Sequence, residues 1–383
     1  MNYKFNFQLF WVIVALFAFA LSGCRKDDPV IPGEEEPLPP QTATTVKGFY
    51  LLNEGNMNMN KASLDYYDYE TGTYRRNLYG QANPEAVLGL GDVGSDLGIY
   101  GSKLYAVING SNKVEVMDAK TAKRLKVIDA KNCSYITFAN GKAYVSVYGG
   151  EIQTGEVSPN GYVAEIDTAT LAVTRTVQVG RQPEELAVVG DKLYVANSGG
   201  YSPPNYEKIV SVVNLNTFTK MRDIEVAPNL HRLKADAYGD LYVSSRGDYI
   251  NEPSRLFVID TKTDAVKKSF DISCTNFAIA GDTAYIVGME FSYATFDWTI
   301  NYSMVNVKTE TLLEGGFLPK PVGDALKTPY GIAVDPVSKN IYITDAADYV
   351  SPGTLYCIDK DGKTVFTVST GDIPSQIVFL YQN

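Results

Sequence analysis

Hydrophobic and polar positions alternate with period two along most of the chain from about residue 46 onward. One phrase recurs, made of a short β run, a tight turn and a second β run centred on a tyrosine. Its copies read "LGIYGSKLYAV", "ITFANGKAYVSV", "LAVVGDKLYVAN", "LKADAYGDLYVSS", "FAIAGDTAYIVG" and "GIAVDPVSKNIYIT". This alternation is typical of half-buried strands, and clusters of turn residues separate one strand from the next. The pattern predicts an all-β protein.

Each tyrosine run is followed by another alternating run, such as "KVEVMD" or "RLFVID", and then by a turn and a fourth run such as "TRTVQVG". Each repeat therefore has four strands. The tyrosines that mark the repeats are Tyr50, Tyr105, Tyr144, Tyr194, Tyr242, Tyr285 and Tyr342. Their spacing averages about 49 residues, within the range of ~40–50 residues for propeller blades. Seven such repeats predict a seven-bladed β-propeller.

The first repeat, "GFYLLNEG", lacks the β run that precedes the tyrosine in the other repeats. The missing run stands at the other end of the chain, in "SQIVFLYQN". We therefore expect the strand Ser375–Leu380 to pair beside Gly48–Asn53, which closes the ring without a free edge. The alternative is an open stack of repeats, which leaves the displaced strand unexplained.

The first 23 residues have the features of a secretory signal. Lys4 is their only charge, and the apolar run Leu9–Leu21 is shorter than the ~20 residues that a membrane-spanning helix needs. The ending Leu21-Ser22-Gly23-Cys24 resembles a bacterial lipobox, which implies cleavage before Cys24 and lipidation of its thiol. The alternative is an ordinary signal peptide with an incidental cysteine.

Lys26-Asp27-Asp28 resembles the surface-export signal of Bacteroidota lipoproteins, although it also fits a solvated charge cluster. The segment that follows is rich in proline and glutamate and has little to bury. We expect three regions: a signal peptide at 1–23, a lipidated, acidic and flexible tether at 24–45, and the propeller at 46–383. This arrangement predicts an outer-membrane protein anchored by lipid and facing the cell exterior.

Charge and cysteine content exclude several functions. The net charge is −10, and removal of the signal with Lys4 leaves about −11, whereas nucleic-acid binding needs a basic face. We therefore expect no nucleic-acid partner, and membrane contact through the lipid anchor only. Cys133, Cys274 and Cys357 form no close pair and are interpreted as buried apolar residues rather than disulfides. One histidine and no CxxC motif provide no pattern of metal ligands.

The connections between strands differ between the two faces of the expected propeller. Those joining strands one to two and three to four are short turns such as "NGK" and "GDK". Those joining strands two to three are long, and long loops on a rigid scaffold are usually functional. They span residues 53–63, 148–162, 197–208, 245–254, 288–302 and 345–353.

The long loops are rich in aromatic side chains, which offer large contact areas with a polar edge. The shorter loops that enter each first strand bring charged residues toward the axis of the same face. His231 suits a metal centre carried by a ligand, but a hydrogen-bonded histidine is the simpler interpretation. The candidate ligand-binding residues are Met57, Asp96, Tyr148, Tyr162, Arg181, Tyr201, Tyr206, His231, Arg246, Tyr249, Phe291, Tyr293, Trp298, Tyr302 and Tyr349. The alternative is that the loops pack on themselves.

Binding is favoured over catalysis. A single histidine is too few for metal-dependent redox chemistry. The acid pairs Glu184/Glu185 and Asp345/Asp348 suit a general acid and base, but loop carboxylates are more often solvated. A calcium-dependent, lactonase-like site stays open because Asp, Glu and Asn supply the oxygen ligands that Ca²⁺ prefers. We expect no enzyme, no catalytic residue and no bound metal.

Tyr194-Val195-Ala196-Asn197 and the "ID-T-T" turns at Asp167–Thr170 and Asp260–Thr263 resemble the YVTN (YncE-like) propeller repeats. With the lipobox, the export signal and the Tyr- and Asn-rich loops, the chain resembles the surface vitamin B12-binding lipoproteins of gut Bacteroidota, the BtuG type. That resemblance implies cobalamin or a related corrinoid as ligand, no other cofactor, and a TonB-dependent transporter as partner. Glycan binding beside a TonB-dependent glycan transporter is the alternative.

Overall fold

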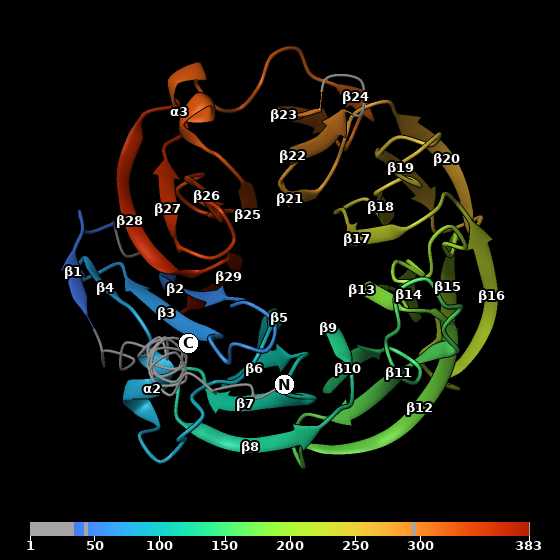
Figure 1. Cartoon of the computed structure of the whole chain (residues 1–383), viewed down its shortest axis with the longest axis horizontal. Coiled ribbons are helices and arrows are strands. Elements are labelled where there is room, and N and C mark those ends of the chain that lie inside the picture. Colours follow the sequence, from blue (N-terminus) through green and yellow to red (C-terminus); the bar gives the residue numbers. More distant parts are fainter. Residues whose placement is uncertain (1–33, 42–44, 293–295, 383) are drawn as a thin grey trace, which may run out of the picture. The chain divides into compact units, whose positions relative to one another are not determined.

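The computed structural model describes residues 34–41, 45–292 and 296–382, all within one compact unit, Gly33–Asn383. In this unit seven antiparallel sheets stand like blades around a ring (Figure 1). Four strands build each blade, and the first blade has a fifth. The prediction of a seven-bladed, all-β propeller is confirmed.

The first blade is, from the axis outward, β29 (Pro374–Tyr381), β2 (Val46–Asn53), β3 (Ser63–Asp68), β4 (Thr73–Arg75) and β1 (Glu35–Pro37). The next three are β5 (Gly94–Tyr100), β6 (Lys103–Ile108), β7 (Lys113–Asp118), β8 (Arg124–Asp129); β9 (Cys133–Ala139), β10 (Lys142–Val147), β11 (Asn160–Asp167), β12 (Ala172–Arg181); and β13 (Pro183–Val189), β14 (Lys192–Asn197), β15 (Ile209–Asn214), β16 (Thr219–Glu225). The last three are β17 (Leu230–Ala235), β18 (Asp240–Ser245), β19 (Arg255–Asp260), β20 (Ala265–Phe270); β21 (Asn276–Ala280), β22 (Thr283–Ser292), β23 (Asp297–Asn306), β24 (Thr311–Leu312); and β25 (Pro329–Val334), β26 (Ile341–Asp345), β27 (Pro352–Ile358), β28 (Thr364–Asp372).

The C-terminal strand closes the ring as predicted. β29 pairs antiparallel with β2, from Val46 opposite Tyr381 to Asn53 opposite Pro374. On either side it packs against β25 and β5, the innermost strands of the neighbouring blades. Both ends of the propeller sequence are therefore held in one sheet, and the innermost ring has no open position.

The recurring tyrosine of the second strand ties the first, fourth and fifth blades to the blades that follow them. Six of the seven rings are buried, and that of Tyr285 is half-buried. The hydroxyl of Tyr50 donates to Ala119 O (2.9 Å), that of Tyr194 to Asp264 (2.8 Å) and that of Tyr242 to Val307 O (3.2 Å). Each acceptor lies at the connection between strands three and four of the following blade. Tyrosine suits this position because its ring fills the space between blades while its hydroxyl reaches a polar partner.

Two features depart from the sequence expectations. Glu35–Pro37, assigned to the flexible tether, form β1, which pairs with β4 and brings Glu35 within 2.8 Å of Arg75. Two short helices, α2 (Leu78–Ala82) and α3 (Lys320–Ala325), occur in connections where no helical pattern was evident, because so few residues cannot show a 3.6-residue period. No helix in the described part of the chain is both long and apolar enough to cross a bilayer.

The three cysteines of the propeller are free and buried, as the sequence predicts. Cys24 and the other residues of the expected signal and export motif lie outside the described residues. The lipid anchor therefore stays a prediction.

Candidate functional site

A repeated backbone irregularity shapes the centre of one face. Six of the seven innermost strands contain a β-bulge. In each, the register of pairing with the second strand shifts directly after the first residue of the innermost strand. Bulges re-aim side chains and are frequent beside functional sites. Here the bulges place one residue from each of six blades at the same level of the ring. In the blade without a bulge, Thr275 takes that position. These residues are Ser95, Ser134, Glu184, His231, Thr275, Tyr330 and Ser375.

Hydroxyl groups on the second strands stabilise these bulges. A bulge leaves a backbone N–H without a partner in the ladder, and such a group is costly when buried. Ser146 Oγ accepts from Tyr135 N (2.9 Å), Ser244 Oγ from Arg232 N (3.0 Å) and Thr344 Oγ1 from Gly331 N (2.7 Å). The hydroxyl residue lies two positions after the blade tyrosine in all three repeats.

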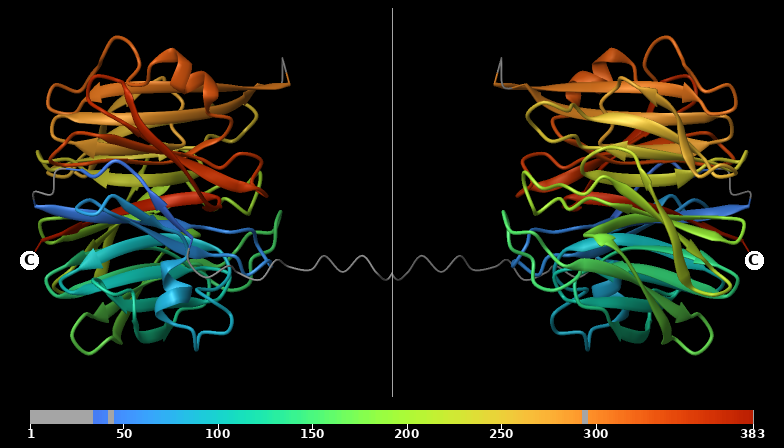
Figure 2. Two further views of the ribbon diagram at one scale, coloured as in Figure 1. Left: turned by 90° about the vertical axis from the view of Figure 1, so that its left-hand side faces the viewer. Right: turned by 90° about the vertical axis from the view of Figure 1, so that its right-hand side faces the viewer.

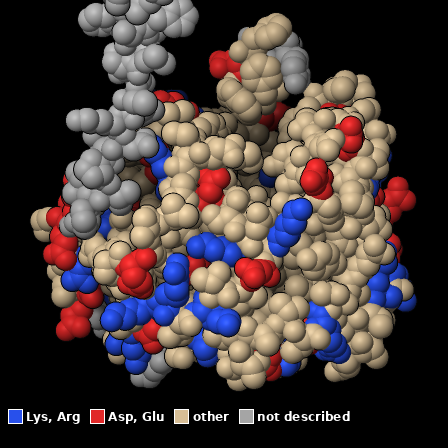
Figure 3. Space-filling model, turned by 60° about the horizontal axis from the view of Figure 1, so that its bottom comes forward, with Lys and Arg blue, Asp and Glu red and all other residues tan. Residues whose placement is uncertain are grey.

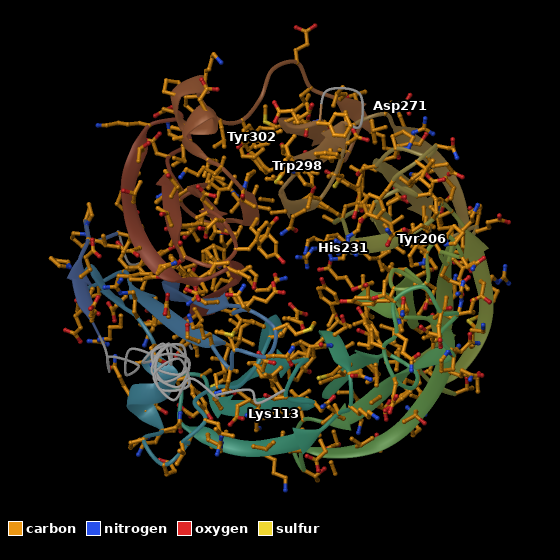
Figure 4. The ribbon with its side chains drawn as sticks, in the orientation of Figure 1. Lys113, Tyr206, His231, Asp271, Trp298 and Tyr302 are labelled. Carbon is orange, nitrogen blue, oxygen red and sulfur yellow. The ribbon has the colours of Figure 1, made fainter. Side chains whose placement is uncertain are left out.

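The ring of bulge residues lines a central cavity of about 450 Å³. His231 lies at the margin of the central opening in Figure 4. Loop residues complete the wall, including Asn56, Met57, Tyr148 and Tyr201. The cavity is therefore polar at its base, with aromatic side chains from the long loops above.

The carboxylates of the cavity are held by neutral donors. Glu184 is 5% exposed and accepts from the hydroxyls of Tyr148 (3.0 Å), Ser198 (3.0 Å) and Ser134 (3.4 Å). Glu54 accepts from the Tyr330 hydroxyl at 2.8 Å. Burial raises the pKa of Glu54 to about 7, although the Tyr330 hydroxyl lowers it.

The cationic and imidazole groups come from two neighbouring segments of one blade. His231 Nε2 lies 2.8 Å from the Tyr135 hydroxyl, and burial, with the nearby Arg246 and Arg232, lowers the pKa of His231 well below its usual value. The imidazole is therefore neutral at physiological pH. Arg232 is 5% exposed, and its guanidinium lies 5.1 Å from the centre of the Tyr135 ring.

A second cavity of about 520 Å³ adjoins the first. The two share Arg246, Tyr249, Thr275 and Tyr330 as lining residues. The other walls of this lateral cleft are mainly apolar or aromatic: Ile250, Pro253, Cys274, Met289, Phe291, Trp298, Pro329 and Tyr349. A polar central cavity thus opens into an aromatic cleft.

The most prominent wall of the cleft is an extended hairpin. Within the segment 288–302, expected as a loop, residues 288–292 and 297–302 continue the strands β22 and β23 beyond the blade, with Phe291 opposite Trp298. Their rings meet edge to face at 5.3 Å. In Figure 2 this hairpin projects from the face opposite to the one that holds the C-terminus.

Nine of the fifteen candidate residues line one or both cavities, and a tenth lies directly behind the wall. They are Met57, Tyr148, Tyr201, His231, Arg246, Tyr249, Phe291, Trp298 and Tyr349, together with Asp96 immediately behind the wall. All six long loop segments contribute lining residues. The sequence thus identified the face on which the cavities lie.

The structure places four candidates elsewhere, and Tyr293 lies outside the described residues. Tyr162 packs into the core between two blades, and Tyr302 packs on Phe317 near α3 (Figure 4). Arg181 is bound to Glu207 at 3.0 Å, and Tyr206 stands behind Tyr249, ring to ring at 6.2 Å. These side chains support loops rather than line a cavity, because neighbouring residues of the same loops occupy the inner positions.

Several lining residues are absent from the sequence candidates, among them Glu54, Tyr135, Arg232 and Tyr330, and Glu184 is named there only as a general acid or base. Alignment of the repeats at the start of each first strand would have found four of them, since Glu184 and Tyr330 occupy bulge positions and Tyr135 and Arg232 directly follow such positions. Glu54 carries no such signal. Within the described ranges, no group of three or more His, Cys, Asp or Glu side chains is arranged to hold a metal ion.

The model of the family described as "Domain of unknown function (DUF5074)" matches residues 47–372, well over half of the 383-residue chain. The chain belongs to the DUF5074 family. The match covers nearly all of the propeller and every lining residue of the two cavities except Ile373 and Ser375. No curated protein matches the chain in sequence.

Solved structures share the fold at low sequence identity. A quinoprotein alcohol dehydrogenase-like protein from Bacteroides thetaiotaomicron VPI-5482 has a TM-score of 0.59 and 18% identity, over 88% of this chain and 79% of that chain. A candidate 6-phosphogluconolactonase from Bacteroides fragilis NCTC 9343 has a TM-score of 0.59 and 13% identity, over 88% and 99%. Hydrazine synthase of Kuenenia stuttgartiensis has a TM-score of 0.55 and 16% identity, over 70% and 77%. These likenesses show the fold alone.

Asp96 gives the stability of this site a pH dependence. Burial raises the pKa of its carboxyl to about 7, although the backbone N–H groups of Ile136 and Leu97 lower it. Because the folded protein keeps a proton that the unfolded chain releases, stability falls as pH rises toward 7. Asp96→Asn removes this proton uptake. The free energy of unfolding of the wild type, relative to that of Asp96→Asn, should therefore fall by about 1.4 kcal/mol between about pH 6 and about pH 8. Urea unfolding at both pH values measures it.

The control for this prediction is Asp129→Asn, at an exposed position at the end of β8. Its difference from wild type should be the same at both pH values. An Asp96→Asn protein whose difference from wild type is also independent of pH would contradict a protonated Asp96.

Proposed function

We propose that this protein is a cell-surface binding protein that captures cobalamin or a related corrinoid and passes it to a TonB-dependent outer-membrane transporter. The observation that carries the proposal is the pair of adjoining cavities on the long-loop face, one polar and one aromatic. Cobalamin has matching chemistry, since it is a broad apolar ring edged by amides with a polar nucleotide tail. Ligand sites combine apolar walls with a few placed polar groups in this way.

The aromatic cleft suits the face of the corrin ring. Trp298, Tyr249 and Tyr349 are 55%, 51% and 41% exposed, so they retain apolar surface for a ligand to bury. Tyr249 and Tyr349 also hold the left-handed backbone conformation, with φ of 62° and 63°. Bulky residues rarely adopt it, and such strain is often kept at binding sites.

The central cavity suits the polar edge of the ligand. Asn56, Asn109, Asn229 and Asn276 line it beside the charged groups, and amides pair well with amides. In this proposal the carboxylates position hydroxyl groups rather than perform chemistry, since the oxygens of Glu184 already accept from three hydroxyls. The protein acts as a binder and not as an enzyme.

The location on the cell surface rests on the lipobox at Cys24 and on Lys26-Asp27-Asp28. A lipid at Cys24 and the residues between it and β1 would tether the propeller at the membrane, where it could dock on a transporter. Charged side chains of both signs are interspersed over the side of the propeller visible in Figure 3.

A glycan is the second candidate ligand. The same exposed rings of Trp298, Tyr249 and Tyr349 would stack on sugar faces. The two candidates separate in one experiment: calorimetric titration of the purified full chain with cyanocobalamin and with a panel of oligosaccharides. We expect one-to-one binding of cyanocobalamin, with the visible absorption of the ligand co-eluting with protein in gel filtration. Heat with a sugar and none with cobalamin would reject the corrinoid and favour the glycan.

A further inference from the structure

Two arginines reach the central cavity without close anionic partners. Arg232 is 5% exposed, and no carboxylate of the described residues lies within the 4.0 Å ion-pair distance of its guanidinium. Arg246 lines both cavities, and its only ion-pair contact with another described residue is Glu184, at the 4.0 Å limit. A buried guanidinium is normally paired, because the loss of hydration is otherwise not offset.

The neighbours of Arg232 hold it in place without neutralising it. Its guanidinium stacks over the Tyr135 ring at 5.1 Å. Both terminal nitrogens reach the side-chain amide of Gln376 on β29, at 2.8 and 3.2 Å with the amide oxygen turned toward them. Its Nε is buried and has no acceptor in the part of the chain that the structure describes. The side chain is therefore oriented and keeps an N–H donor unused.

The nearby acids are committed to other donors. Glu184 accepts from three hydroxyls, Glu54 from Tyr330, and Glu185 from Lys234 at 2.7 Å. Burial also raises the pKa of Glu54 to about 7, so its carboxyl is partly protonated near neutrality. The cavity therefore presents two fixed positive charges whose hydrogen-bonding capacity is not used up by the protein.

We propose that the central cavity is a subsite for an oxyanion, the phosphate or carboxylate group of a small-molecule ligand, bound between Arg232 and Arg246. Guanidinium groups recognise both oxyanions through paired, charge-assisted hydrogen bonds. A bound oxyanion would supply the close ion pair that Arg232 lacks and that Arg246 makes only at the 4.0 Å limit with Glu184. This subsite does not depend on the ligand being a corrinoid.

The test uses simple aromatic anions with the full chain in detergent. Phenyl phosphate, benzoate and neutral benzyl alcohol are titrated into the protein by calorimetry. We expect at least one of the two anions to bind at least about tenfold more tightly than the alcohol, and more weakly as salt is added. Tighter binding of phenyl phosphate identifies a phosphate subsite, and tighter binding of benzoate a carboxylate subsite. If neither anion binds better than benzyl alcohol, the proposal is overturned.

Charge-removing variants locate the subsite. Arg232→Met and Arg246→Met should each weaken anion binding at least about tenfold, as expected for the loss of a charge-assisted contact of about 1.4 kcal/mol or more. Arg246 is the less buried of the two side chains, so its variant covers the case in which Arg232→Met does not fold. The control is Arg222→Met, which removes an exposed arginine of β16 that lies 3.8 Å from Asp264. Anion binding that survives in the Arg246 variant would overturn the proposal.

This outcome is separable from that of the proposed function. Cobalamin binding without any binding of the simple anions would support the corrinoid and reject the oxyanion subsite. Anion binding lost in the arginine variants, with no binding of cobalamin, would support the subsite and reject the corrinoid.

Discussion

Removal of residues 374–383 is expected to destabilise the whole propeller. The deletion takes away β29, which pairs with β2 from Val46 to Asn53 and packs between β25 and β5. It leaves the inner edge of β2 without a partner, since β3 still pairs with the outer edge, and it opens the innermost ring on both sides. We expect an insoluble product, or a melting midpoint at least about 15 °C below that of the wild type. Thermal denaturation followed by circular dichroism measures the change.

The matched control removes a strand from the other edge of the same sheet. Deletion of Glu35–Pro37 takes away β1, which pairs only with the three residues of β4 at the outer margin of the blade. Its loss should shift the midpoint by no more than about 5 °C. A chain truncated at residue 373 that melts like this control would show that β29 does not hold the ring closed.

Trp298→Ala is expected to weaken cobalamin binding by at least about tenfold, or about 1.4 kcal/mol. The side chain lines the aromatic cleft and is 55% exposed, so a bound ligand can bury much of its apolar surface. Its edge-to-face contact with Phe291 and its position in a long hairpin hold the ring in place. Rigid aromatic anchors of this kind carry a large share of binding energy. Calorimetric titration with cyanocobalamin gives the affinity.

Two variants make this result specific. Trp298→Phe keeps an aromatic face and should retain most of the affinity. Tyr238→Ala removes an aromatic side chain that is 43% exposed in the turn between β17 and β18, on the opposite face, and should bind like wild type. Unchanged affinity in Trp298→Ala would mean that the ligand does not use the lateral cleft.

The fold could be predicted because its signals are local and repeated. Alternation within each strand, the second-strand tyrosines and the Asx turns recur in each blade. The turn at Asp167 shows the chemistry, since its carboxylate accepts from Ala169 N at 3.0 Å and Thr170 N at 2.8 Å. Even the ring closure was visible, because one repeat lacked a strand that the other end of the chain supplied.

The backbone at the entrance to the inner strands could not be predicted from the residues. Val93 and Ile373 hold φ of 53° and 54°, although β-branched residues disfavour this conformation. They lie two positions before Ser95 and Ser375, where Asn132, Gln182 and Asn229 have the same conformation in other blades. The packing of the assembled ring imposes this turn, and residue propensity opposes it at two of the five positions.

The sequence by itself determined the seven blades, the closure of the ring and the face that carries the long aromatic loops, because each follows from patterns within or between adjacent strands. Only the tertiary structure decided which side chains meet in the cavities. Glu54 and Tyr330 are 276 residues apart and share a hydrogen bond of 2.8 Å, and Arg232 reaches Gln376 from a different blade. Closing the ring brings the innermost strands of all blades around one axis, so groups unrelated in sequence become neighbours in a partly dehydrated space. Their contacts and the raised pKa values of Glu54 and Asp96 exist only there.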